Sequence, residues 1–168
     1  MRRVLSWIFP YRTLTIETSL SPAEVHERLE KDVAPRRGTL RVFEVGLYNG
    51  RVDETGFDFR RSISGRNSFL PNVVGTIEPT PFGSRVHVHL KMPTVVTVFL
   101  AFWLGMVALM AIPFLFAMPF PFNVIPFGLL AFGTMLPKLG FNSEANLAER
   151  FLTDTLPLAE GGAIGAYR

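Results

Sequence analysis

Two histidines in residues 85–91 are the side chains with the clearest potential for catalysis. His87 and His89 are two positions apart, so a β-strand would project both imidazoles from one face, where they could share a metal ion. The same face carries Arg85 and Lys91, which repel a cation, and no carboxylate lies nearby in the sequence. We therefore interpret this strand as a basic one that faces solvent or lipid headgroups, with a metal-dependent enzyme using both histidines as an alternative.

A cluster of arginines is the second group with a definable chemistry. Arg60, Arg61 and Arg66 flank the segment 62–65, which contains two serines and a glycine. Guanidinium groups and loop amides of this kind bind phosphate. The Walker glycine-lysine pattern is absent, and no helix follows the loop in the sequence to add its dipole. We therefore predict a basic loop near lipid phosphates and no nucleotide site.

Other kinds of catalytic site find no support in the sequence. The chain of 168 residues has no cysteine, which excludes disulfides, thiolate zinc sites and thiol nucleophiles. Its acidic residues are scattered, so no pair has the spacing expected of a general acid and a general base. We therefore predict no catalytic residue, no metal ligand, no bound cofactor and no enzymatic activity.

The positive charge is concentrated before residue 92. The net charge of +3 divides into +4 for residues 1–91, from fourteen basic and ten acidic side chains, and −1 for residues 138–168, from three and four. A basic excess suits anionic lipid or nucleic acid, and the long apolar segment of this chain favours lipid over nucleic acid. The residues that we predict to contact anionic lipid headgroups are Arg2, Arg3, Arg12, Arg60, Arg61, Arg66, Arg85, His87, His89, Lys91 and Lys138.

The apolar segment covers residues 92–137, forty-six positions without a charged residue or a histidine. One membrane crossing needs about 20 apolar residues, so this length predicts a helical hairpin, which we place at 93–141. Its helices are expected at about 95–117 and 124–141, joined by a proline-rich turn at 118–123. Lys91 and Lys138 flank the hairpin whereas the turn has no basic residue, so both termini are expected in the cytoplasm. A re-entrant path that dips into one leaflet remains an alternative to two crossings.

A soluble domain is predicted at 13–92. Leu14 and Ile16 alternate with polar residues, as in a half-buried strand. A helix then begins at Ser21, which forms a capping box with Glu24, and it carries an apolar stripe at every fourth position from Val25 to Val33. The alternation at 43–47, 57–60, 73–78 and 85–91 predicts four strands, with a hairpin turn at residues 49–50, Asn-Gly. The predicted fold class is α+β, a small antiparallel sheet with one packed helix.

The two ends of the chain are predicted to be separate small elements. Residues 1–12 combine arginines with aromatic residues, which suits a segment at the membrane interface, and an edge segment packed on the soluble domain is the alternative. Residues 142–158 are expected to form a new amphipathic helix with Ser143 as its N-cap, packed on the sheet, on lipid or on a partner. Residues 159–168, rich in glycine, are expected to be a flexible tail.

Two partial resemblances to known proteins add to these predictions. Residues 15–30, with Ser-Leu-Ser-Pro at 19–22, resemble the first strand and helix of helix-grip domains of the START and polyketide-cyclase type. That resemblance implies a curved sheet gripping a long C-terminal helix, often around an apolar ligand, and here the hairpin takes the place of the gripping helix. Residues 67–71, Asn-Ser-Phe-Leu-Pro, with Gly-Thr-Ile at 75–77, resemble uncharacterised small bacterial membrane proteins with a soluble α+β domain and a two-helix hairpin. This second resemblance implies no activity.

The sequence therefore predicts a non-enzymatic, membrane-anchored interaction or accessory subunit in the cytoplasmic (inner) membrane. Its partners are the lipid bilayer and either a second copy of the chain or another membrane protein. The alternative is a helix-grip-like domain that binds lipid or another hydrophobic ligand beside the membrane.

Overall fold

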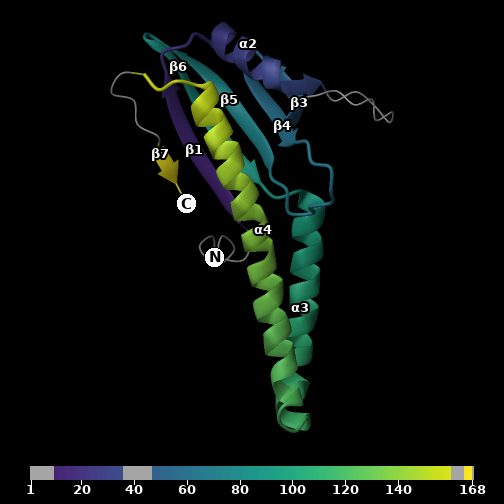
Figure 1. Cartoon of the computed structure of the whole chain (residues 1–168). Coiled ribbons are helices and arrows are strands. Elements are labelled where there is room, and N and C mark those ends of the chain that lie inside the picture. The colour runs from purple at the N-terminus through teal and green to yellow at the C-terminus, as the bar shows by residue number, and fades with distance from the viewer. Residues whose placement is uncertain (1–9, 36–46, 160–164, 168) are drawn as a thin grey trace.

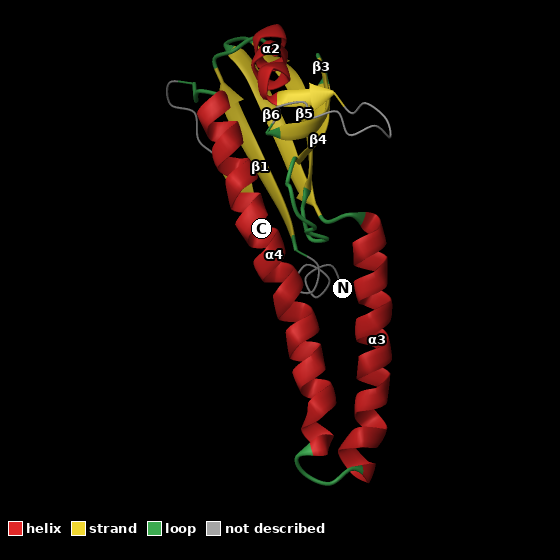
Figure 2. Ribbon diagram, turned by 45° about the vertical axis from the view of Figure 1, so that its right-hand side comes forward, coloured by secondary structure: helices red, strands yellow, loops and turns green. Residues whose placement is uncertain are grey.

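The computed structural model describes residues 10–35, 47–159 and 165–167 (Figure 1). The predicted lipid contacts Arg2 and Arg3, most of the N-terminal segment and the strand expected at 43–47 lie outside these residues, apart from Leu47 itself. What is described is an α+β structure from which a helical hairpin projects (Figure 2).

The sheet is larger than predicted and is mixed. It has seven strands in the order β2-β3-β4-β5-β6-β1-β7, of which β2 and β3 are parallel and all other neighbours antiparallel. The strands are β1 (Tyr11–Thr18), β2 (Val33–Pro35), β3 (Tyr48–Asp53), β4 (Gly56–Arg61), β5 (Asn72–Thr80), β6 (Gly83–Lys91) and β7 (Gly165–Tyr167). The prediction of a small, wholly antiparallel sheet is therefore wrong in its size and at the pair β2–β3, while the α+β class is confirmed.

Helix α2 (Pro22–Asp32) forms for the reasons visible in the sequence. The Ser21 backbone N–H donates to Glu24 Oε2 at 2.8 Å, and the Glu24 N–H donates to Ser21 Oγ at 3.4 Å, so the capping box is complete. Hydrogen bonds from the side chain and backbone of Ser21 lower the pKa of Glu24. Val25 and Leu29 are fully buried, which directs the apolar stripe of the helix onto the sheet.

The hairpin turn predicted at Asn49 and Gly50 is wrong. Strand β3 runs straight through both residues, and the turn to β4 lies at residues 54–55. Gly50 pairs with Phe59 in the neighbouring strand, where a Cβ on residue 50 would collide with the backbone and Cβ of Phe59. This glycine permits a close approach of two strands, which is the second common role of glycine in sheets.

The predicted hairpin is present as two long helices, α3 (Thr94–Ala117) and α4 (Ile125–Thr155), joined through a short 3-10 turn, η1 (Phe122–Val124). Both helices are long and apolar enough to cross a membrane. Only 17% and 22% of the most apolar 18-residue stretch of the first and second helix is buried, so neither resembles the core helix of a soluble protein.

Helix α4 is one element where two were predicted. It runs unbroken for 31 residues, about 46 Å, from the tip of the hairpin to the far part of the sheet. Ser143 is therefore not an N-cap, because it lies inside the helix and its Oγ donates to the Gly140 carbonyl at 3.1 Å. The helix continues because its buried positions keep helical spacing beyond Gly140, at Phe141, Ala145, Ala148 and Leu152.

One hydrophobic core joins helix α2 and the C-terminal part of α4 to the sheet. The end of α4 and helix α2 cover the same face, and their buried side chains belong to one cluster with those of β1, β4, β5 and β6. A long C-terminal helix therefore lies along the sheet, in the place where the hairpin alone was expected. Of the three placements that the sequence left open for residues 142–158, the structure has the one on the sheet.

The C-terminal residues include a strand where a flexible tail was predicted. The Ala159 N–H donates to the Glu17 carbonyl at 3.0 Å, and β7 pairs antiparallel with Thr13, Leu14 and Thr15 of β1. The prediction of a wholly flexible tail is therefore wrong for residues 165–167, because β1 offers them an edge with unpaired backbone groups.

Candidate functional site

The candidate site lies at the end of the sheet from which the hairpin leaves. Strand β6 ends at Lys91, three residues before α3 begins. Pairing across the sheet places Tyr11 opposite Lys91, Lys91 opposite Asn72, and Asn72 opposite Arg60. Arg60 and Lys91 are therefore in one row, on the face that α2 and α4 leave uncovered.

An open hollow of about 580 Å³ lies beside this row. The structure brings Arg60, Arg61 and Arg66 together around it, as the sequence predicted. Asn49 of β3 and the first turn of α3 complete the wall, which sequence reasoning missed because these residues are distant in the chain. The full lining is Asn49, Arg60, Arg61, Ser62, Ile63, Gly65, Arg66, Asn67, Ser68, Leu70, Pro93 and Val96.

The loop that forms most of this wall is held by its own hydrogen bonds. The Asn67 side-chain oxygen accepts from the Phe69 N–H at 3.0 Å, and the Asn67 carbonyl accepts from the Leu70 N–H at 3.3 Å. Arg60 Nη2 donates to the same carbonyl at 3.4 Å. Leu70 is buried, so the loop is anchored on the core and presents its polar side chains to the hollow.

Two of the residues predicted to contact lipid form ion pairs that fasten the sheet to α4. Arg61 Nη1 lies 2.9 Å from Glu144 Oε2, and Arg12 Nη1 lies 3.0 Å from Glu149 Oε2. Arg12 also donates to the Asn146 side-chain oxygen at 2.6 Å. Glu144 thus offsets the charge of one of the three arginines that line the hollow.

An aromatic cluster supports the strand that carries Arg61. The Tyr48 ring, opposite Arg61 in the β3–β4 pair, contacts Phe59 at a centroid distance of 5.1 Å and Phe151 of α4 at 4.3 Å. Burial raises the pKa of Tyr48, so its hydroxyl stays protonated at neutral pH. The cluster thus positions the arginine and adds no charge of its own.

The two histidines lie on the uncovered face of β6, on the same side as Arg85 and Lys91, as predicted. His87 Nδ1 lies 3.1 Å from Thr15 Oγ1 and its Nε2 lies 3.7 Å from Glu78 Oε2. His89 Nδ1 lies 3.2 Å from Thr13 Oγ1. Within residues 10–35, 47–159 and 165–167, no group of three or more histidine, aspartate or glutamate side chains is placed to hold a metal ion.

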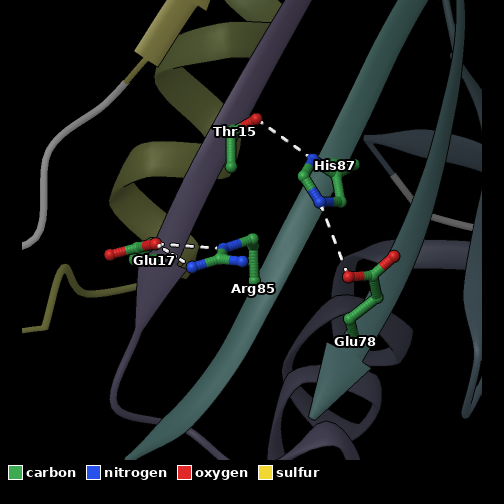
Figure 3. Close-up of polar contacts among 5 residues, drawn as sticks. All are labelled: Thr15, Glu17, Glu78, Arg85 and His87. Atoms are coloured by element: carbon green, nitrogen blue, oxygen red, sulfur yellow. Dashed lines mark hydrogen bonds and ion pairs between the residues drawn. The ribbon is translucent and has the colours of Figure 1, made fainter. Parts of the chain in front are cut away.

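Carboxylates do lie beside this strand, although none is near it in the sequence. Glu17 of β1 accepts two hydrogen bonds from Arg85, at 2.8 and 3.0 Å, and Glu78 of β5 faces His87 (Figure 3). Strand pairing brings them there, since β6 lies between β5 and β1. Arg85 is thus in an ion pair on the sheet, far along β6 from the hairpin.

The remaining predicted contacts differ in position. Arg66 and Lys91 are exposed at the hairpin end of the sheet. Lys138 lies in α4 next to Pro137, where the helix passes from the hairpin to the sheet. Positively charged side chains therefore lie at the end of the sheet where the apolar helices begin.

Comparison of the chain with protein-family models, with curated proteins and with solved structures finds no match.

Proposed function

We propose that this protein is a membrane-anchored, non-enzymatic interaction or accessory subunit that holds its α+β domain at a fixed position on the cytoplasmic face of the inner membrane. The observation that carries the proposal is the continuity of α4. One helix is both the second arm of the hairpin and a part of the domain core.

The contacts of α4 support a rigid connection. A flexible linker between anchor and domain would let the domain rotate freely, whereas an unbroken helix transmits the orientation of the hairpin to the sheet. The Arg12–Glu149 and Arg61–Glu144 ion pairs add polar contacts between β1, β4 and the helix. The face of the sheet that carries Arg85 and His87 would then always be turned the same way relative to the bilayer, as recognition by a fixed partner requires.

The distribution of charge supports the orientation. Lys91 and Lys138 flank the apolar helices at the sheet end, and the turn between the helices has no charged residue. Basic residues are retained on the cytoplasmic side of membranes, so two crossings would leave the sheet and both termini in the cytoplasm.

The absence of cysteine makes the topology testable with single substitutions. Phe122 lies in the hairpin turn with 55% of its side chain exposed, and Ser64 is exposed on the soluble domain. We expect Phe122→Cys to react with an impermeant thiol reagent from the periplasmic side, and the control Ser64→Cys to react only from the cytoplasmic side of inverted vesicles. Labelling of both cysteines from the cytoplasmic side alone would show a re-entrant hairpin and overturn the two crossings.

The role as an accessory subunit can be tested separately from the membrane topology. Crosslinking in cells should capture either a second copy or another membrane protein. A protein that is monomeric in detergent and captures no partner would not be an accessory subunit.

A further inference from the structure

We propose that the hollow beside Arg60, Arg61 and Arg66 binds the phosphate of an anionic phospholipid headgroup. The proposal rests on the proposed function in one respect, because it requires the domain to sit on the bilayer.

The position of the hollow places it at headgroup level. Pro93, the N-cap of α3, and Val96 in its first turn line the hollow, and the chain from residue 92 to 137 has no charged side chain. The apolar helix enters the bilayer where its uncharged stretch begins, so the hollow opens at the boundary between hydrocarbon and water. A lipid beside α3 would have its phosphate within reach of the arginines.

The lining combines polar and apolar groups, as an amphiphile requires. The polar groups are the guanidinium groups, the hydroxyls of Ser62 and Ser68, and two asparagine amides. The apolar residues are Ile63, Leu70, Pro93 and Val96. Phosphate oxygens suit the polar groups, because guanidinium forks bind them through paired hydrogen bonds, and glycerol and the start of an acyl chain suit the apolar residues.

The charge of the hollow favours an anionic lipid over a zwitterionic one. Arg61 is paired with Glu144, and the exposed Arg66 brings a positive charge to the hollow that attracts a headgroup with a net negative charge. A choline headgroup carries the same phosphate, but its quaternary ammonium group would be repelled by these arginines. Arg66 contributes most directly, since it is exposed and lies on the loop rather than in a strand.

The test uses the full chain, delipidated in detergent, titrated with short-chain phosphatidylglycerol, with phosphatidylcholine and with inorganic phosphate. We expect phosphatidylglycerol to bind and Arg66→Gln to weaken it about fivefold, the effect of one basic residue near a lipid surface. The matched control is Arg150→Gln, which removes an equally exposed positive charge from α4, outside the hollow, and should leave binding unchanged.

A second pair of variants keeps the positive charges in place. Ser68 lines the hollow, whereas Ser64 is exposed on the same loop outside it. Ser68→Asp should weaken phosphatidylglycerol binding at least about fivefold by bringing a negative charge to the phosphate, and Ser64→Asp should not. Both serines are exposed, so neither substitution disturbs the core.

Three outcomes would overturn the proposal: equal binding of the two lipids, equal effects within either pair of variants, or full competition by inorganic phosphate. The last result would show a site for the free anion. These outcomes are independent of the cysteine labelling, so the hollow can fail while the anchored topology stands, and a re-entrant hairpin can be found while the hollow still binds lipid.

Discussion

At the scale of single residues, the arginines of this chain have two different uses that their spacing does not reveal. Arg61 and Arg60 are neighbours in β4 and therefore point to opposite faces of the sheet. Arg61 reaches Glu144, whose side chain is only 14% exposed, and Arg60 belongs to the row that ends at Tyr11. Both arginines line the hollow, but only Arg61 also fastens a helix through Glu144.

The ion pair between Arg61 and Glu144 should contribute measurably to stability. We expect Glu144→Gln to lower the free energy of unfolding by about 1 kcal/mol, because a partly buried guanidinium loses its counter-charge while one hydrogen bond is retained. The control is Glu27→Gln, which removes an exposed i,i+4 partner of Lys31 and should cost less than about 0.5 kcal/mol. Denaturant unfolding of the full chain in detergent, followed by circular dichroism, measures both. Equal effects would show that the Arg61 contact is a surface pair of no special weight.

At the scale of elements, the continuity of α4 distinguishes the structure most clearly from the sequence-based prediction. Gly140 and Ser143 are typical of a helix end and a new helix start. The helix continues because Phe141, Ala145, Ala148 and Leu152 are buried on one stripe, and burial of that stripe outweighs the low helix propensity of one glycine.

Substitution of Ser143 separates the two interpretations. In an uninterrupted helix, Ser143→Ala should leave the free energy of unfolding unchanged or raise it slightly, whereas loss of an N-cap would cost about 1 kcal/mol. Ser143→Pro should cost about 3 kcal/mol or more, because proline removes a backbone donor and clashes with the preceding turn. The same unfolding experiment measures both variants. A destabilised Ser143→Ala together with a tolerated Ser143→Pro would show a helix start at this position.

At the scale of the whole molecule, the soluble domain is not a continuous piece of the chain. Its core takes side chains from β1 through β6, Leu100 from α3 and, after the hairpin, side chains from Phe141 to Leu156. The hairpin is therefore an insertion into the domain, between its last long strand and its last helix. The domain boundary predicted at residue 92 separates parts of the chain that share one core.

Truncated chains should show this discontinuity. We expect residues 10–92 alone to be insoluble or to unfold without cooperativity, because the buried face of α4 is missing and core side chains meet water. Residues 10–92 joined to 140–159 by a flexible linker of about 12 residues should unfold cooperatively, since the deleted apolar helices contribute only Leu100 to the buried core cluster. Thermal unfolding followed by circular dichroism compares the two. Equally cooperative unfolding would mean that the sheet and α2 form a domain without α4.

The sequence by itself determined the features that depend on neighbouring residues. The capping box at Ser21, the alternation in β1, β4, β5 and β6, and the uncharged length of the hairpin are local properties, and each predicts its element directly. The basic character of the segment 60–66 is visible in the sequence for the same reason.

Only the tertiary structure decided what depends on residues far apart in the chain. Strand β3 continues through Asn49 and Gly50 in the folded protein, because Gly50 packs closely against Phe59 of the neighbouring strand. The order of the strands places Glu78 beside His87. The start of α3 places Pro93 beside the arginines of the hollow. The physical reason is the same in each case: hydrophobic burial and strand pairing act between distant segments, and they override a local turn or cap signal whenever the buried area is larger.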